Sequence, residues 1–138
     1  MKRLICLAAL ALAPTGAVLA EDQYYSSIED AASLREEHVW RFESDSVTRQ
    51  ADMIRFDVKA GWKSPEARPA TEAPGRVIRY LARCESKELA LMAVAVLDNS
   101  RRVVKTFGIA PGGWDWALPA NGTTEAELLN KACSVKLL

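Results

Sequence analysis

The sequence has few of the residues that hold metals and redox cofactors, with one histidine and three cysteines among 138 residues. A metal centre built on several histidines therefore cannot come from this chain alone, and we expect no metal and no cofactor. The sequence also lacks an excess of charge of one sign, because 18 basic and 18 acidic residues cancel. Proteins that bind nucleic acids or anionic membranes carry a basic excess, so we expect no nucleic acid partner.

No apolar run is long enough to cross a membrane. The longest is the ten residues Leu4–Ala13, whereas a helix that spans the hydrocarbon core of a bilayer needs about 20. The run follows two basic residues and precedes small residues at Val18 and Ala20, which is the pattern of a secretory signal peptide. We therefore predict a signal peptide at residues 1–20 and an exported, single domain at 21–138 with no membrane span.

The alternative for the leader is an uncleaved membrane anchor, which the shortness of the run disfavours. A lipid anchor needs a cysteine at the end of the apolar run, and Cys6 lies near its start. After cleavage Cys84 and Cys133 remain, and an even pair in an oxidising compartment predicts one disulfide. A catalytic cysteine acting with His38 is the competing interpretation, but it needs a free thiolate that an oxidised pair does not offer.

Five segments alternate between apolar and polar residues, or are apolar throughout, as strands are. They are residues 39–47, 53–59, 76–84, 89–97 and 103–109. The polar residues 44–52 fit a turn after the first strand. Leu89–Leu97 is apolar on both faces, so we expect an interior strand covered above and below; a helix over 85–97 is the alternative. Asp98–Ser100 supplies the turn of an antiparallel hairpin.

Helical patterns lie near both ends of the mature chain. Thr124–Glu127 has the sequence of a capping box, and the apolar residues after it recur at helical spacing. Cys133 lies on that apolar stripe, so a bridge to Cys84 would tie the helix to the sheet. Residues 21–37 fit either a short helix after Ser27 or a mobile arm. The patterns predict an α+β fold, with an antiparallel sheet and a C-terminal helix packed on one face.

Residues 61–75 contain three prolines, which favours an extended loop over a central strand. Such a loop is either a binding element or a solvated connection. Tryptophans near glycine and proline either anchor a partner or fill a small core, and arginines at a hairpin tip either contact a ligand or keep the protein soluble. As candidate partner-binding residues we take Trp62, Lys63, Trp114, Trp116, Arg101 and Arg102.

The sequence shows no set of residues arranged for catalysis. The segment GIAPGG lacks the lysine and the hydroxyl residue of a phosphate loop. Glu125 and Glu127 lie in a first helical turn, where carboxylates complement the helix dipole. His38 is a lone acid–base candidate, and a histidine at the edge of a strand is usually solvated. We therefore expect no catalytic residue and a protein that is not an enzyme.

Several motifs follow one another in order. The first motif, IRYLARC, ends in the first cysteine of the mature chain. It is followed by an apolar strand and then by RRVVKTFG, WDWALP and ELLNKAC, the last of which ends in the second cysteine. Upstream, RFESDSVTR and MIRF form a first hairpin, with acidic and serine positions at Asp45 and Ser46. In these features residues 39–134 resemble the surface-adhesin protein E family of Gram-negative bacteria.

The resemblance implies an antiparallel sheet of about six strands, with the C-terminal helix tied to it by a Cys84–Cys133 disulfide. It also implies a non-enzymatic protein that binds host extracellular-matrix or serum proteins at the bacterial surface and self-associates through its sheet as a homodimer. The sequence departs from the family in its leader, which lacks a lipid-attachment cysteine, in residues 61–75, and at Ala120–Asn121, where a serine is expected nearby. The alternative is a periplasmic envelope protein or an inhibitor of a wall-degrading enzyme.

Overall fold

The computed structural model describes residues 24–35 and 37–137, so the predicted signal peptide lies outside the described residues. The elements, in chain order, are α2 (Ile28–Ala32), β1 (His38–Gln50), β2 (Met53–Trp62), a 3-10 turn (Pro65–Ala67), β3 (Gly75–Arg83), β4 (Glu88–Leu97), β5 (Val103–Gly108), a second 3-10 turn (Pro111–Gly113) and α3 (Thr124–Ser134). Within the described residues, no helix combines the length and apolar character that a membrane crossing requires.

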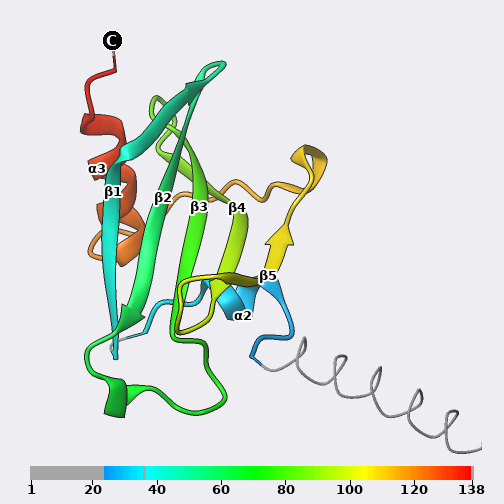
Figure 1. Ribbon diagram of the computed structural model, residues 1–138. Coiled ribbons are helices and arrows are strands. Elements are labelled where there is room, and N and C mark those ends of the chain that lie inside the picture. Colours follow the sequence, from blue (N-terminus) through cyan, green and yellow to red (C-terminus); the bar gives the residue numbers. More distant parts are fainter. Residues whose placement is uncertain (1–23, 36, 138) are drawn as a thin grey trace, which may run out of the picture.

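The five described strands form one antiparallel sheet, and they lie side by side in the order in which the chain makes them (Figure 1). The predicted α+β fold is therefore confirmed, with five strands where the resemblance implies about six. The difference is small, because the chain after β5 returns to β4 for one more antiparallel bridge, between Leu89 and Ala117. Since β4 lies between β3 and β5, its predicted interior position is confirmed and the alternative helix over 85–97 is wrong.

The turn predicted over residues 44–52 is wrong, because β1 continues to Gln50 and the chain reverses only at the next two residues. The strand stays paired with β2 across a register shift between Glu43 and Thr48. The Ser46 hydroxyl lies at this bulge. It donates to the Glu43 carbonyl (2.6 Å) and accepts from the Asp57 amide (2.8 Å). A side chain thus replaces the ladder bonds that the bulge removes, and the polar segment remains a strand.

One face of the sheet packs against both helices. Phe56 and Ile78 from the strands, Ala31 from α2 and Leu128 from α3 are all 0% exposed and belong to the same apolar cluster. Of the two predictions for residues 21–37, a short helix or a mobile arm, the described part forms the short helix. The Ser27 side chain accepts a hydrogen bond from an amide in the first turn of α2. Both helices therefore cover the same face, and the opposite face has no helix over it among the described residues.

This opposite face, which we call the open face, is covered only at one end. Leu81 and Ala90 form a directly paired, buried couple there, and the guanidinium carbon of Arg83 lies 3.9 Å from the ring centroid of Trp116. Further along β4, Ala95 and the alternate residues on either side of it are only half-buried. The prediction that Leu89–Leu97 is covered on both faces is therefore wrong over the second half of the strand.

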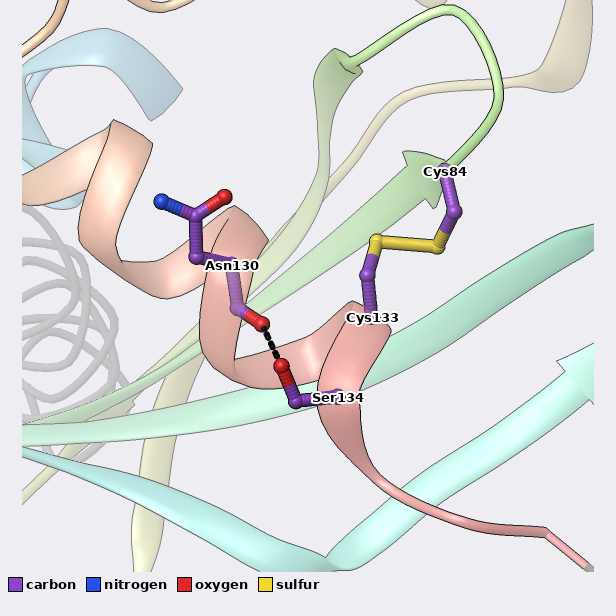
Figure 2. Close-up of a disulfide and its surroundings, with 4 residues drawn as sticks. All are labelled: Cys84, Asn130, Cys133 and Ser134. Carbon is purple, nitrogen blue, oxygen red and sulfur yellow. Dashed lines mark hydrogen bonds between the residues drawn. A yellow bond between two sulfur atoms is a disulfide. The ribbon is translucent and has the colours of Figure 1, made fainter.

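The C-terminal helix is fixed to the sheet by the predicted disulfide. Cys84 follows the end of β3 and Cys133 lies in the last turn of α3, with 5.7 Å between their Cα atoms (Figure 2). The N-cap of α3 lies one residue before the predicted capping box, because Thr123 is the extended residue whose side chain accepts from the Ala126 amide. Next to the bridge, the Ser134 hydroxyl donates to the Asn130 carbonyl one turn earlier in the helix (2.7 Å).

Candidate functional site: a groove on the open sheet face

The open face carries a groove of about 750 Å³, which we call the glycine groove. It lies toward the end of the sheet where the β2–β3 connection and the tip of the β4–β5 hairpin come together, at the lower end of the sheet in Figure 1. Its lining residues come from β1 to β4 and the turns beside them: Val39, Trp40, Arg41, Lys59, Ala60, Gly61, Trp62, Pro74, Gly75, Arg76, Val77, Leu97, Asp98, Asn99 and Arg101.

Two glycines form the floor of the glycine groove. Gly61 pairs with Val39 of β1, and Gly75 pairs with Leu97 of β4. A β-carbon on Gly61 would meet its nearest atom at 3.9 Å, and one on Gly75 would meet its nearest, the Ala60 carbonyl oxygen, at 3.7 Å. These are ordinary contacts, so the structure has room for side chains at both positions. The missing side chains leave the strand backbone open to a molecule that approaches it closely.

The wall on the β1 and β2 side is cationic. Arg41 and Lys59 form a directly paired couple on the open face, and both extend toward the same carboxylate, Glu43. The distances to the Glu43 carboxylate are 3.4 Å from Arg41 and 2.8 Å from Lys59. The hydrogen bond from Lys59, followed by the charges of the two cations, lowers the pKa of Glu43. One carboxylate therefore serves two cations, and this wall retains a net positive charge.

The opposite wall is the tip of the β4–β5 hairpin. The Asp98 carboxylate accepts hydrogen bonds from the amides of Ser100 (2.8 Å) and Arg102 (2.9 Å), and it pairs with the Arg102 guanidinium at 3.4 Å. The backbone hydrogen bond from Arg102 leads the interactions that lower the pKa of Asp98. Asp98 therefore holds the turn. Arg101, at a φ of 61°, is an exposed cation that lines the groove.

Another ion pair lies one row further along the open face. Asp57 and Arg79 are directly paired across β2 and β3, and the guanidinium binds both carboxylate oxygens, at 2.8 and 3.0 Å. The hydrogen bond to Asp57 raises the pKa of Arg79. Because Asp57 holds this guanidinium through two hydrogen bonds, the Asp57–Arg79 pair is a fixed structural feature beside the groove.

Behind the groove, His38 lies in a buried polar cluster that includes Trp62 and Arg76. His38 is 6% exposed, so the prediction of a solvated histidine is wrong; the T-shaped contact with the Trp62 ring, at 4.4 Å between centroids, covers it. The His38 Nδ1 atom accepts from the Arg35 amide (2.8 Å), and the Arg76 guanidinium lies 3.2–3.3 Å from both ring nitrogens. Burial, and then the charge of Arg76, lowers the pKa of His38.

Arg76 is itself buried, and it holds the N-terminal segment on the sheet. Its guanidinium donates to the carbonyls of Ala31 and Ser33, and it lies 5.4 Å from the centroid of the Tyr25 ring. Burial lowers the pKa of Arg76. Its charged group is therefore committed to the helix-covered face, although the residue also lines the groove.

The structure brings only part of the predicted binding set together. Trp62 and Arg101 both line the glycine groove, and Arg102 adjoins it through its contacts with Asp98. Lys63 is exposed and follows the end of β2. The Trp62 indole is also structural, since its Nε1 donates to the Ala73 carbonyl (2.9 Å) and closes the base of the proline-rich loop.

The other two predicted tryptophans do not line the groove. Trp114 donates to the Ile109 carbonyl (3.0 Å), and its ring meets that of Trp116 edge-on at 6.5 Å between centroids. Trp116 stacks on Arg83 at the covered end of the open face. Both side chains therefore take part in packing, which is the interpretation that the sequence left open beside partner binding.

Sequence reasoning missed the residues that define the floor and the cationic wall: Arg41, Lys59, Gly61 and Gly75. The signal that could have found them is their position in the strands. The cations alternate with the apolar residues of β1 and β2, and a glycine within a strand marks a close approach of backbone or ligand. Within residues 24–35 and 37–137, no cluster of three or more histidine, cysteine, aspartate or glutamate side chains is placed to hold a metal ion.

No protein-family model matches the chain, and neither does any curated protein. Among solved structures, crystal form II of Haemophilus influenzae protein E aligns with 12% sequence identity and a TM-score of 0.50, covering 74% of this chain and 91% of that one. A second structure of Haemophilus influenzae protein E covers 82% of this chain and 93% of its own, with 12% identity and a TM-score of 0.48. At this identity the likeness shows the fold, and the resemblance to protein E that the motifs predict is confirmed at that level.

Proposed function

We propose that the chain is an exported, non-enzymatic binding protein, similar to surface adhesins, whose partner is a host extracellular-matrix or serum protein. The observation that carries the proposal is the glycine groove, a cationic hollow of about 750 Å³ on a sheet face that no described helix covers. The fold of protein E supports it, as does the resemblance of residues 39–134 to the surface-adhesin protein E family. We assign the partner to this groove rather than to the tryptophans at 114 and 116.

The chemistry of the groove favours binding over catalysis. Its described lining contains one carboxylate, Asp98, and this group is tied to two backbone amides of its own turn. General acid–base catalysis needs a titratable group within hydrogen-bond reach of the substrate. His38, the candidate from the sequence, is enclosed by Trp62 and Arg76 on the far side of the strands. Cations beside an apolar floor are suited to holding a partner.

The test compares two glycine variants that add the same side chain to the same face. Gly75→Val fills the groove floor, whereas Gly108→Val adds a valine to β5, where a β-carbon meets nothing within 4 Å. Binding of the mature chain to immobilised laminin, vitronectin and fibronectin is measured by biolayer interferometry. We expect binding that Gly75→Val weakens and Gly108→Val leaves unchanged. If neither variant changes the binding, the groove is not the site.

A second candidate function is inhibition of a wall-degrading enzyme in the periplasm. The observation that favours it is the bracing of the loop between β2 and β3, which a protruding inhibitory loop requires. Arg68 donates to the Glu72 carbonyl (2.8 Å), Arg35 pairs with the Glu72 carboxylate, and Trp62 closes the base. Loss of lysozyme activity on titration with the purified chain, restored by deletion of residues 63–73, would favour this function over adhesion.

Protease shaving of intact cells separates the two compartments. We expect the mature chain to be digested on whole cells if it acts as an adhesin. Protection until the outer membrane is permeabilised would instead place the protein in the periplasm, and the inhibitor function would then take precedence. The same cells report the size of the mature chain, and therefore whether the predicted signal peptide has been removed.

We also propose that the chain forms a homodimer through its sheet. β1 is 13 residues long and lies at the end of the strand order, so one of its edges has no neighbouring strand among the described residues. An edge of this kind is a template for pairing with a second chain. Sedimentation equilibrium over a hundredfold concentration range should give twice the mass of the mature chain; a constant monomer mass would contradict the dimer.

A further inference from the structure

We propose that the glycine groove binds an extended acidic segment of the protein partner, with carboxylates at the two walls and small or apolar side chains over the floor. This inference rests on the proposed function, because it names the chemistry of the partner at the same groove. Its carrying observation is the distribution of charge in the lining. The cations Arg41 and Lys59 form one wall, Arg101 forms the other, and the floor between them is uncharged.

The charges of the walls are complementary to an acid. Arg41 and Lys59 share the single carboxylate of Glu43, so a second carboxylate can bind beside it without displacing an existing partner. Both cations are well exposed, with side-chain exposures of 71% and 53%, so a carboxylate can reach them from solvent. On the other side, the carboxylate of Asp98 is occupied by its own turn and by Arg102, and Arg101 is an exposed cation of the groove lining.

The width of the groove fits a short stretch of extended chain. Lys59 lies on β2 and Arg101 follows β4, and neighbouring strands lie about 4.8 Å apart, so the two walls are separated by about 10 Å. An extended peptide rises about 3.3 Å per residue, and three to four residues therefore span the floor. With no side chain at Gly61 or Gly75, the backbone of such a peptide can lie flat against the strands.

The apolar floor favours a peptide over a uniformly charged polymer. Val77, Leu97 and Pro74 line the middle of the groove, and none of them can compensate a buried anion. A sulfated polysaccharide or a nucleic acid would place its anionic groups over these apolar side chains. The anionic groups would then lose water without gaining a cation or a hydrogen-bond donor. A peptide with acidic residues at its two ends and small or apolar residues between them instead meets charge at the walls and apolar atoms at the floor.

The probe is a fluorescein-labelled pentapeptide with a glutamate at each end and three valines between them, and its control has glutamine in place of both glutamates. Fluorescence anisotropy measures the binding of each to the mature chain. We expect the glutamate peptide to bind more tightly than the glutamine peptide, and the difference to shrink as the salt concentration rises. Lys59→Gln and Arg101→Gln should each weaken binding about threefold to fivefold, as loss of one exposed ion pair does. Arg49→Gln, at an exposed cation of β1 outside the groove, should leave it unchanged.

Steric block gives an independent readout. Gly75→Val should abolish binding of the glutamate peptide, and Gly108→Val should not. Equal affinity for the glutamate and glutamine peptides would overturn the proposal, and the proposed function would still stand if Gly75→Val weakened binding of the matrix proteins. Heparin and a single-stranded DNA 20-mer are measured in the same way. If either binds more tightly than the glutamate peptide, and Gly75→Val abolishes that binding, the groove is a general polyanion site and the proposal is also overturned.

Discussion

Removal of the Cys84–Cys133 disulfide should lower the free energy of unfolding without preventing folding. The double variant Cys84→Ala/Cys133→Ala removes the bridge and leaves no free thiol in residues 21–138. The helix that carries Cys133 keeps its packing on the sheet in this variant, because Leu128 and Ala132 are both 0% exposed and Leu129 is 4% exposed. The expected loss therefore arises chiefly in the unfolded chain.

The size of the loss follows from the length of the closed loop. The two cysteines are 49 residues apart, and the chain-entropy relation for a loop of that length gives about 4 kcal/mol at 25 °C. The usual range for such bridges in small secreted domains is about 2–5 kcal/mol. For a chain of this size, a loss of 4 kcal/mol lowers the melting temperature by roughly 16 °C.

Urea denaturation followed by tryptophan fluorescence measures the loss, with the free energy extrapolated to water because the uncrosslinked chain exposes more surface on unfolding. Wild-type protein treated with a reductant should match the double variant, and the reductant should leave the double variant unchanged. Equal extrapolated free energies for the oxidised wild type and the double variant would refute the reasoning.

Three further predictions concern the core, the buried histidine and the open face. Leu128→Ala leaves a cavity under α3 and should cost about 2–5 kcal/mol in urea denaturation. The pKa of His38 is lowered by burial and by Arg76, so the unfolded chain binds the proton more readily than the folded chain. The free energy of unfolding should therefore be at its full value above about pH 6.5 and should fall as the pH drops through the lowered pKa. The variant His38→Gln should lack this loss between pH 7 and 5. Asp57→Asn weakens a half-exposed ion pair and should cost no more than about 1 kcal/mol, measured by thermal melting.

Much of the fold could be predicted because burial on one face leaves a two-residue period in the sequence. The apolar positions of β2 and β3 mark the face that packs on the helices, and the structure buries Phe56, Val58 and Ile78 there. The disulfide could be predicted because the two remaining cysteines lie on elements that both face the core. These inferences depend on local pattern, which a single sequence carries.

Features that depend on tertiary contacts could not be predicted. Residues 44–52 read as a turn because their side chains are polar, but the Ser46 hydroxyl supplies the hydrogen bonds of a bulge and the strand continues. His38 read as solvated because no buried partner is adjacent in sequence; its partners, Trp62 and Arg76, come from other strands. The glycine groove is likewise assembled from four strands, so no segment by itself shows its two cationic walls.

The order of the strands has a consequence for how the chain folds. Each strand pairs with its neighbour in sequence, so the sheet can grow hairpin by hairpin at low contact order, which favours fast folding. The disulfide is different, because Cys133 can reach Cys84 only after α3 has docked beside the completed sheet. With two cysteines in residues 21–138, a wrong pairing within that part of one chain cannot form. A wrong disulfide must therefore link two separate chains. Slow docking of α3 would favour such intermolecular disulfides.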